Sequence, residues 1–262
     1  MVTVGAPRHP LRAQREASLR SRRVGLGVMG LADAMAMLGL RYGAQEALRW
    51  AEDCLRRIRD AAYAASVELA REKGIFPVFD PRRHEQSPFV QRLPEGLRRA
   101  LRRWGLRNAA LLAVAPTGSI SLLAGASSGI EPIFGIRYTR LVAGQRHAAQ
   151  HPLLDLYRRE TGRDDPDWPT AHQVDPLSRV RLQAAAQRYV DQSISSTVNL
   201  PASAGREVVE RVYRAAWELG CKGITVFREG SRAPVLEAAG SPVAVCTLCE
   251  PGPEGADSPP SP

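Results

Sequence analysis

Hydrophobic side chains recur at helical spacing along much of the chain. Between Ala44 and Lys73 they follow one another at steps of three and four residues, which predicts one long helix with a single buried stripe that ends at Gly74. The run from Arg23 to Gly39 has the same spacing, and its small residues predict a helix packed closely on its neighbours. Further helices are predicted over 95–104, 151–162, 180–194 (capped by Ser178) and 206–219 (capped by Ser203).

Two short apolar runs predict buried strands. Residues 109–115 are bounded by polar residues and lead into a tight turn and then a small, apolar stretch, which gives the order strand, turn, helix. Residues 223–228 (GITVFR) predict the second strand, while 74–89 and most of 141–176 are predicted to be irregular. Helices alternating with few strands favour an α/β fold whose remaining strands come from elsewhere.

Composition is that of a globular chain with a sizeable core. Its 262 residues are 44% hydrophobic and 24% charged. No stretch reaches the roughly 18 apolar residues of a membrane span, and the start lacks the apolar run of a signal peptide, so the protein is predicted to be cytoplasmic, without a membrane partner.

The net charge of +9 comes almost entirely from arginine, because Lys73 and Lys222 are the only lysines. Such an excess can indicate a nucleic acid partner. Most of these arginines, however, are interspersed with acids at helix spacing, which favours solvated helix faces. Nucleic acid binding therefore remains a minor alternative, and a surface for another protein chain explains the excess equally well.

Three regions differ in character. Residues 1–22 are basic and irregular, like the cut end of a longer chain. Residues 23–236 carry the predicted helices and strands. Residues 237–262 are dominated by proline, glycine, serine and acid, which predicts a flexible tail.

The turn APTGSIS (Ala115–Ser121) carries the first candidate chemistry. Its backbone N–H groups, hydroxyls and glycine, placed before a helix, are the ingredients of a phosphate cradle. Many strand-to-helix turns contain the same residues for conformational reasons alone. Taken by itself, the turn leaves both interpretations open.

Four sequence blocks together carry a family resemblance. RNAALLAVAPTGSISLLAGASSGIEPIFGIRYTR (Arg107–Arg140) is preceded by RRVGLGVMGLADAMAMLG and followed by RLQAAAQRYVDQSISSTVNLP and ELGCKGITVFREGSR. In content, order and spacing these blocks resemble adenosylcobalamin-dependent (class II) ribonucleotide reductases, over roughly residues 8–236. The resemblance implies the carboxy-terminal half of a ten-stranded α/β barrel, helix-rich and incomplete in this chain.

The resemblance also implies a substrate site in the first of these blocks. The residues expected to line the site for the substrate's phosphates are Ala115, Pro116, Thr117, Gly118, Ser119 and Ile120. Those expected near the substrate are Ser127, Ser128, Gly129 and Glu131.

The radical chemistry of the resembling family needs a cysteine in an N-x-C-x-E arrangement. Neither Cys54 nor Cys221 has the asparagine and glutamate at those offsets, and both are expected to be small buried hydrophobes. In the family this loop precedes the block that begins here, so the resemblance implies truncation, and no catalytic residue in this chain. It further implies an adenosylcobalamin cofactor, a ribonucleoside diphosphate substrate, a separate amino-terminal reductase half, and an external dithiol reductant such as thioredoxin.

Cys246 and Cys249 form a C-T-L-C pair in the predicted tail. Such a pair could carry electrons into an active site as a dithiol, could be half of a zinc site, or could be a remnant without a role. No second pair follows to complete a zinc site. Four histidines share no ligand spacing and are expected at the surface of loops: His84, His147, His151 and His172.

Three hypotheses follow from the sequence. The chain is a reductase subunit that needs an amino-terminal partner, a catalytically dead remnant of a truncated gene, or a basic nucleic-acid-binding module. A cut barrel with unsatisfied apolar surfaces would favour the first, poor solubility without a partner the second, and salt-sensitive nucleic acid binding the third.

Overall fold

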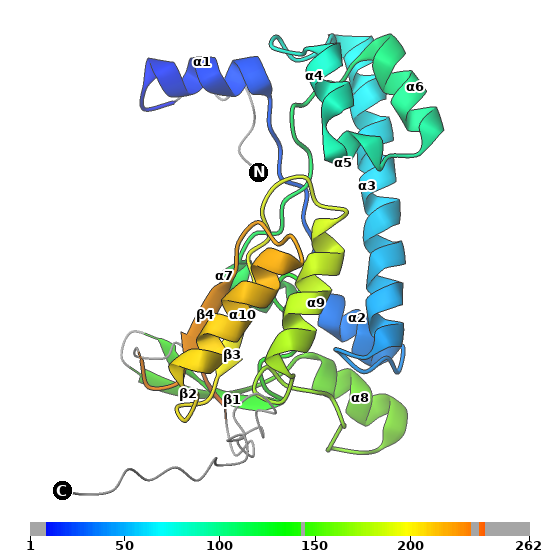
Figure 1. Ribbon diagram of the computed structural model, residues 1–262. Helices are drawn as coiled ribbons and strands as arrows, with labels where there is room; N and C mark the ends of the chain where they lie inside the picture. Colours follow the sequence, from blue (N-terminus) through cyan, green and yellow to red (C-terminus); the bar gives the residue numbers. More distant parts are fainter. Residues whose placement is uncertain (1–8, 143–144, 232–235, 239–262) are drawn as a thin grey trace, which may run out of the picture.

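The computed structural model describes residues 9–142, 145–231 and 236–238 (Figure 1). Its helices are α1 (Arg12–Ser21), α2 (Leu31–Met37), α3 (Gln45–Lys73), α4 (Pro81–Gln86), α5 (Pro88–Gln91), α6 (Glu95–Trp104), α7 (Gly118–Ala124), α8 (Leu153–Thr161), α9 (Pro176–Gln187) and α10 (Arg206–Glu218). Its strands are β1 (Arg137–Val142), β2 (Gln145–Gln150), β3 (Thr197–Leu200), β4 (Thr225–Arg228) and β5 (Leu236–Ala238).

The longest element, α3, is the helix predicted over 44–73. Its buried stripe faces α9 and α6, beside which it runs for most of its length (Figure 1). Gly74 ends it with a positive φ of 79°, and the Gly74 N–H donates to the carbonyl of Ala70 at 2.9 Å. The helix predicted at 95–104 is also confirmed, as α6.

Four extended segments lie side by side and parallel. Residues 24–28 bridge to 110–114, which bridge in turn to 192–196. Residues 192–196 continue directly into β3, and β3 pairs with β4. The N–H of Ser195 donates to the carbonyl of Val114 at 2.8 Å, and that of Leu26 to Leu111 at 2.8 Å. The predicted strand at 109–115 is thus extended and paired through isolated bridges, and the described residues form an α/β fold without a closed barrel.

The predicted helix at 23–39 is wrong in its first half, because only α2 is helical. Residues 24–28 are extended there because Gly27 lies directly against the next segment: a Cβ on Gly27 would stand 2.4 Å from the carbonyl oxygen of Ala113. Gly39, with φ 69°, follows the helix end as predicted. Residues 1–22 are not wholly irregular either, since α1 is a helix without buried residues.

Other boundaries also differ from the predictions. Asp175, whose carboxylate accepts the Ser178 N–H at 2.8 Å, caps α9, so Ser178 is inside the helix. Helix α9 ends at Gln187, before the predicted 194, and the residue preceding α10 is Gly205 rather than Ser203. Strand β4 is partly exposed rather than buried.

Two regions predicted as irregular contain regular structure. The prolines of 74–89 begin the short helices α4 and α5 at Pro81 and Pro88. Strands β1 and β2 form an antiparallel hairpin, to which β5 adds a third strand. The first four residues of β2 are exposed, so its sequence lacks the apolar alternation by which a strand is predicted.

The core consists of two separate clusters of buried apolar side chains. The larger surrounds α2 and α3, and the smaller lies between α9, α10 and β3. Residues of the smaller cluster are Val180, Val198, Leu200, Ala204, Val208, Val212 and Ala216.

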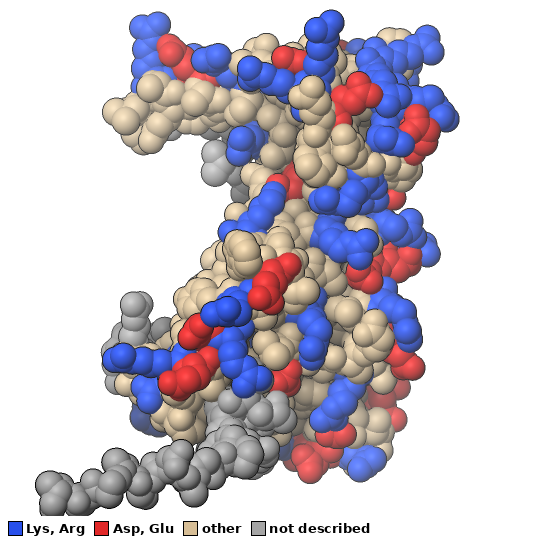
Figure 2. All heavy atoms as spheres, viewed as in Figure 1, with Lys and Arg blue, Asp and Glu red and all other residues tan. Residues whose placement is uncertain are grey.

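Basic and acidic side chains are interspersed over the face seen in Figure 2. On α3, for example, both Arg56 and Arg57 pair with Asp53. These two agree with the prediction that arginines lie on solvated helix faces, whereas Arg59 on the same helix is 4% exposed and does not. Within the described part of the chain, no helix is both long and apolar enough to span a membrane.

Candidate functional site

The predicted phosphate-binding turn joins the extended segment 110–115 to α7. The N–H of Thr117 donates to the carbonyl of Ala115 at 2.9 Å, and Ser121 Oγ donates to the carbonyl of Gly118 at 3.1 Å. Thr117 is half-buried, whereas the other five predicted residues, Ala115, Pro116, Gly118, Ser119 and Ile120, are exposed. The turn is therefore largely exposed at the carboxyl end of a parallel segment, where α/β folds bind ligands.

The side chain of Thr117 connects this turn to the second predicted block. Its Oγ1 accepts the N–H of Gly129 at 2.9 Å and lies 3.3 Å from the hydroxyl of Ser128. The structure thus brings the predicted residues 115–120 and 127–131 together.

The second block is held by several distant segments. Ser127 N–H donates to Asp33 Oδ2 at 2.6 Å, and the carbonyl of Ile130 accepts the hydroxyl of Tyr42 at 2.7 Å. Glu131 Oε1 accepts the N–H of Thr197 at 2.9 Å, at the start of β3. Glu131 therefore has a structural role here, because its carboxylate accepts the first N–H of β3.

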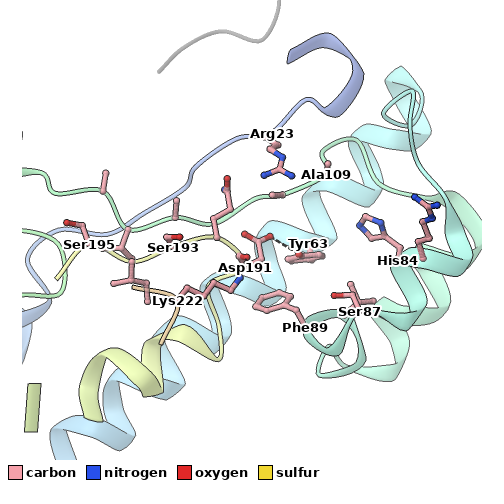
Figure 3. A pocket seen from close by; sticks show the side chains of 18 residues that line it. Arg23, Tyr63, His84, Ser87, Phe89, Ala109, Asp191, Ser193, Ser195 and Lys222 are labelled. Atoms are coloured by element: carbon pink, nitrogen blue, oxygen red, sulfur yellow. Dashed lines mark hydrogen bonds between the residues drawn. The ribbon is translucent and has the colours of Figure 1, made fainter. Parts of the chain in front are cut away.

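A cavity of about 890 Å³ runs along the parallel segments and reaches Ala115 (Figure 3). Its wall on one side is formed by 109–115 and 191–195, and on the other by the region of α4 and α5. The polar residues that line it are Arg23, Tyr63, Arg83, His84, Ser87, Asp191, Gln192, Ser193, Ser195 and Lys222.

Asp191 lies in the wall of this cavity and joins three parts of the chain. Its carboxylate accepts the Tyr63 hydroxyl at 2.7 Å and the N–H groups of Leu111 and Leu112, each at 2.9 Å. Burial raises the pKa of Tyr63, and the Asp191 charge raises it further, so the phenol stays protonated as a donor. With its oxygens engaged, Asp191 is a structural acceptor rather than a free base.

Basic side chains outnumber acidic ones around the cavity. Lys222 Nζ donates to the backbone carbonyl of Asp191, Arg23 lies near Ala109 (Figure 3), and Arg83 also lines the cavity. Burial lowers the pKa of His84, whose ring packs at a tilt against Phe76 and Phe79. The cavity suits a ligand that carries negative charge.

Sequence reasoning missed this cavity because residues 188–194 were assigned to a helix. The stretch DQSISS, from Asp191 to Ser196, contains the residues that compete with helices by bonding to nearby backbone. That signal could have ended the predicted helix near its observed end at Gln187 and pointed to Asp191 as a loop acceptor.

The cysteines give no catalytic pair within the described residues. Cys54 and Cys221 are free and half-buried, and burial raises the pKa of the Cys221 thiol. They are less buried than predicted. The C-T-L-C pair, Cys246 and Cys249, lies outside the described residues.

Among the histidines, His151 does not fit the surface prediction, because it is 6% exposed and faces Asp33. The sequence hides this because Asp33 is far away along the chain. His84 and His172 are half-buried and His147 is exposed, but His84 lies in α4 and His147 in β2 rather than in the predicted loops. In residues 9–142, 145–231 and 236–238, no group of three or more His, Cys, Asp or Glu side chains could hold a metal ion.

The family described as "Ribonucleotide reductase, barrel domain" matches residues 3–227. This chain belongs to that family. It is 40% identical to the "Vitamin B12-dependent ribonucleoside-diphosphate reductase" of Mycobacterium tuberculosis (strain H37Rv), over 87% of this chain and 34% of the relative. It is 34% identical to a Thermoplasma acidophilum protein of the same name, over 91% of this chain and 32% of the relative.

A ribonucleoside-diphosphate reductase subunit alpha from Treponema pallidum is 30% identical, over 80% of this chain and 25% of the relative. The resemblance to ribonucleotide reductases is confirmed, and identity is higher to the two relatives named as vitamin B12-dependent. The barrel-domain chain spans about a third of the length of these two relatives.

Proposed function

We propose that this chain supplies the substrate-phosphate-binding half of an adenosylcobalamin-dependent ribonucleotide reductase. The reaction converts a ribonucleoside diphosphate to its 2′-deoxy form in the cytoplasm. The observation that carries the proposal is the bond from the Gly129 N–H to Thr117 Oγ1, which joins the two blocks expected around the substrate. The names of the relatives at 34–40% identity support the reaction and the cofactor.

In this proposal the exposed turn binds the phosphates. The residues assigned to them are Ala115, Pro116, Thr117, Gly118, Ser119 and Ile120, with Ser127, Ser128, Gly129 and Glu131 near the substrate. The N–H groups of Thr117 and Gly118 are bonded inside the turn, so the turn can offer the N–H groups of Ser119 and Ile120 and the hydroxyls of Thr117 and Ser119, which are good donors to phosphate oxygens. The basic residues of the adjoining cavity add a favourable field for the negative charge.

The partner in this proposal is an amino-terminal reductase half on a separate chain, completing a ten-stranded barrel. Support comes from the two outer segments of the parallel arrangement: Leu26, in segment 24–28, is 50% exposed, and β4 is partly exposed. An open sheet edge is a template for further strands. Helix α7 follows the carboxyl end of segment 110–115, and two of its apolar residues, Ile120 and Leu123, are also exposed.

The cofactor surface belongs, in this proposal, to the partner. The residues that the structure describes do not by themselves fit cobalamin, because Asp191 is saturated with donors and the cavity's histidine, His84, packs at a tilt against two phenylalanines. The radical cysteine is likewise assigned to the partner. An external dithiol such as thioredoxin supplies the electrons, with Cys246 and Cys249 as a shuttle.

Reduction of CDP with adenosylcobalamin and dithiothreitol tests the proposal. The chain alone is compared with the chain plus a polypeptide that carries N-x-C-x-E, and we expect activity only in the mixture. In that mixture Thr117→Val, which removes the bond to Gly129, should raise the KM for CDP by about 10-fold. Thr161→Val, an exposed threonine at the end of α8, is the matched control and should leave the KM unchanged.

Absence of both activity and complex formation would contradict the proposal. The chain would then be the dead remnant of a reductase gene. Salt-sensitive binding to nucleic acid in the same preparation would instead favour the basic binding module.

A further inference from the structure

Two residues at the start of α2 form hydrogen bonds with the backbone of Ser127. Asp33 Oδ2 accepts the Ser127 N–H at 2.6 Å, and the Gly30 N–H donates to the Ser127 carbonyl at 2.8 Å. Asp33 is 8% exposed and Ser127 is 6% exposed, so both bonds are shielded from water. The two residues that follow, Ser128 and Gly129, are those that contact the Thr117 hydroxyl.

The second oxygen of the Asp33 carboxylate faces His151. Asp33 Oδ1 lies 3.3 Å from His151 Nε2, close but not aligned as a hydrogen bond, and no other described group bonds to either atom. His151 Nδ1 accepts the N–H of Leu153 at 3.3 Å. Since Nδ1 is an acceptor, the neutral ring carries its proton on Nε2, the nitrogen that lies beside the carboxylate. Burial lowers the pKa of His151, which keeps this neutral form.

We propose that Asp33 is a positioning residue for the substrate-phosphate site, and that His151 orients its carboxylate. The inference rests on the proposed function, because the loop that Asp33 holds is the one assigned to the substrate. Asp33 touches neither phosphate nor reacting atoms. It fixes Ser127, and through Ser128 and Gly129 it fixes the face against which the Thr117 turn closes.

The free-energy cost of burying the Asp33 carboxylate supports this role. A buried carboxylate is expensive unless donors compensate for its lost hydration, and here the strongest described donor is a backbone N–H of the site loop. Asp33 lies in the first turn of α2, where a negative charge also favours the helix. Its described hydrogen bond, however, goes to the loop, as in sites whose binding residues are held by an outer layer of hydrogen bonds.

The test combines a local structural measurement with a binding measurement. Amide hydrogen exchange of Ser127 and Gly129 is recorded by NMR on the ligand-free chain. Binding of CDP, and of cytidine as the phosphate-free probe, is measured on the same samples. The variants are Asp33→Ala, Asp33→Asn and His151→Gln, with Asp167→Asn as the matched control because Asp167 is 95% exposed.

In Asp33→Ala, exchange at Ser127 and Gly129 should rise by about 10-fold or more, and CDP binding should weaken by about 10-fold, since a buried donor loses its acceptor. Asp33→Asn should show a smaller effect: its oxygen can still accept from Ser127, but its amide group then faces the His151 N–H. His151→Gln, which keeps a donor, should largely preserve both measurements. Cytidine binding should not change in any variant.

Two outcomes overturn the inference. The first is exchange at Ser127 and Gly129 that is unchanged in both Asp33 variants. The second is unchanged CDP affinity in those variants when the parent chain binds CDP. If the parent chain does not bind CDP, the phosphate assignment fails, while the exchange rates still decide whether Asp33 holds the loop. If Asp33→Ala does not fold, Asp33→Asn carries the same decision, measured against Asp167→Asn.

Discussion

The two segments that meet at the candidate site are held in opposite ways. The turn 115–120 is exposed, and the Thr117 hydroxyl is its described side-chain link to the second segment. The loop 127–131 is largely buried and is bonded to α2, Tyr42 and β3. A buried loop with several hydrogen bonds thus supports an exposed turn, which is the arrangement suited to one element that sets geometry and another that makes contact.

The strongest way to break this contrast is at Gly129. Its φ is 50°, and a Cβ would lie 3.2 Å from Val114 Cγ1, so Gly129→Ala combines backbone strain with crowding. We expect a loss of about 2–3 kcal/mol in the free energy of unfolding by urea denaturation. Gly125→Ala is the matched control: φ is 68° there, but the nearest atom, Pro152 Cβ, is 3.7 Å away, and the loss should stay near 1 kcal/mol. Equal losses of unfolding free energy in the two variants would mean that the loop accommodates the added methyl group at little cost.

A smaller effect is expected at Tyr42, which anchors the same loop from the core. Tyr42→Phe removes the buried bond to the Ile130 carbonyl, and stability should fall by about 1 kcal/mol. The control is Tyr213→Phe on α10, where the side chain is 49% exposed and the change should stay within about 0.5 kcal/mol. A Tyr42 variant as stable as the parent would show that the carbonyl finds another donor.

Acidity should loosen the anchored loop through His151. Its pKa lies below the usual value because of burial, so the unfolded chain takes up the proton more readily than the folded one. The contribution of the neutral ring to stability is complete above about pH 6.5 and is lost as the pH falls below that value. This loss of stability is checked by urea denaturation of the parent protein and of His151→Gln at pH values above and below about 6.5.

The pH dependence should be flatter in His151→Gln. His84 and His172 are shifted in the same direction by burial, so the difference between the two proteins isolates His151. Parallel curves would contradict the assignment of a neutral, buried ring.

The exposed turn should show the smallest change in stability. Ser119→Ala should leave the free energy of unfolding within about 0.5 kcal/mol, because the side chain is in solvent. Binding of CDP should nevertheless weaken several-fold if the hydroxyl donates to phosphate. Ser203→Ala, also exposed, should change neither quantity, and an unaltered CDP affinity in Ser119→Ala would remove that residue from the site.

Local patterns predicted the elements whose structure is decided locally. The stripe of α3 and its end at Gly74 are set by spacing and by one glycine. The segment 24–28 was misjudged because its conformation depends on the backbone of Ala113, which approaches Gly27 from far away in the sequence. The site residues came from a family resemblance, and their meeting at Thr117 and Gly129 is a finding of the structure.

The supporting residues could not be predicted in the same way. Asp33 lies within a predicted helix, and His151 was placed in a surface loop. Their pairing is tertiary, and neither residue has a local sequence signal for it. Asp191 differs, because the polar run that follows it could have shown that the helix had ended.

The hydrogen bonds of the Asp191 carboxylate have a consequence for folding during synthesis. The bond to the Tyr63 hydroxyl joins residues 128 positions apart, and the bond to the Leu111 N–H joins residues 80 apart. A ribosome adds roughly 5–20 residues each second, so α3 and the segment 109–115 wait several seconds for the carboxylate that fastens them. During that interval their apolar faces are open to chaperones, and the time at which Asp191 leaves the ribosome sets the earliest moment at which the cavity can exist.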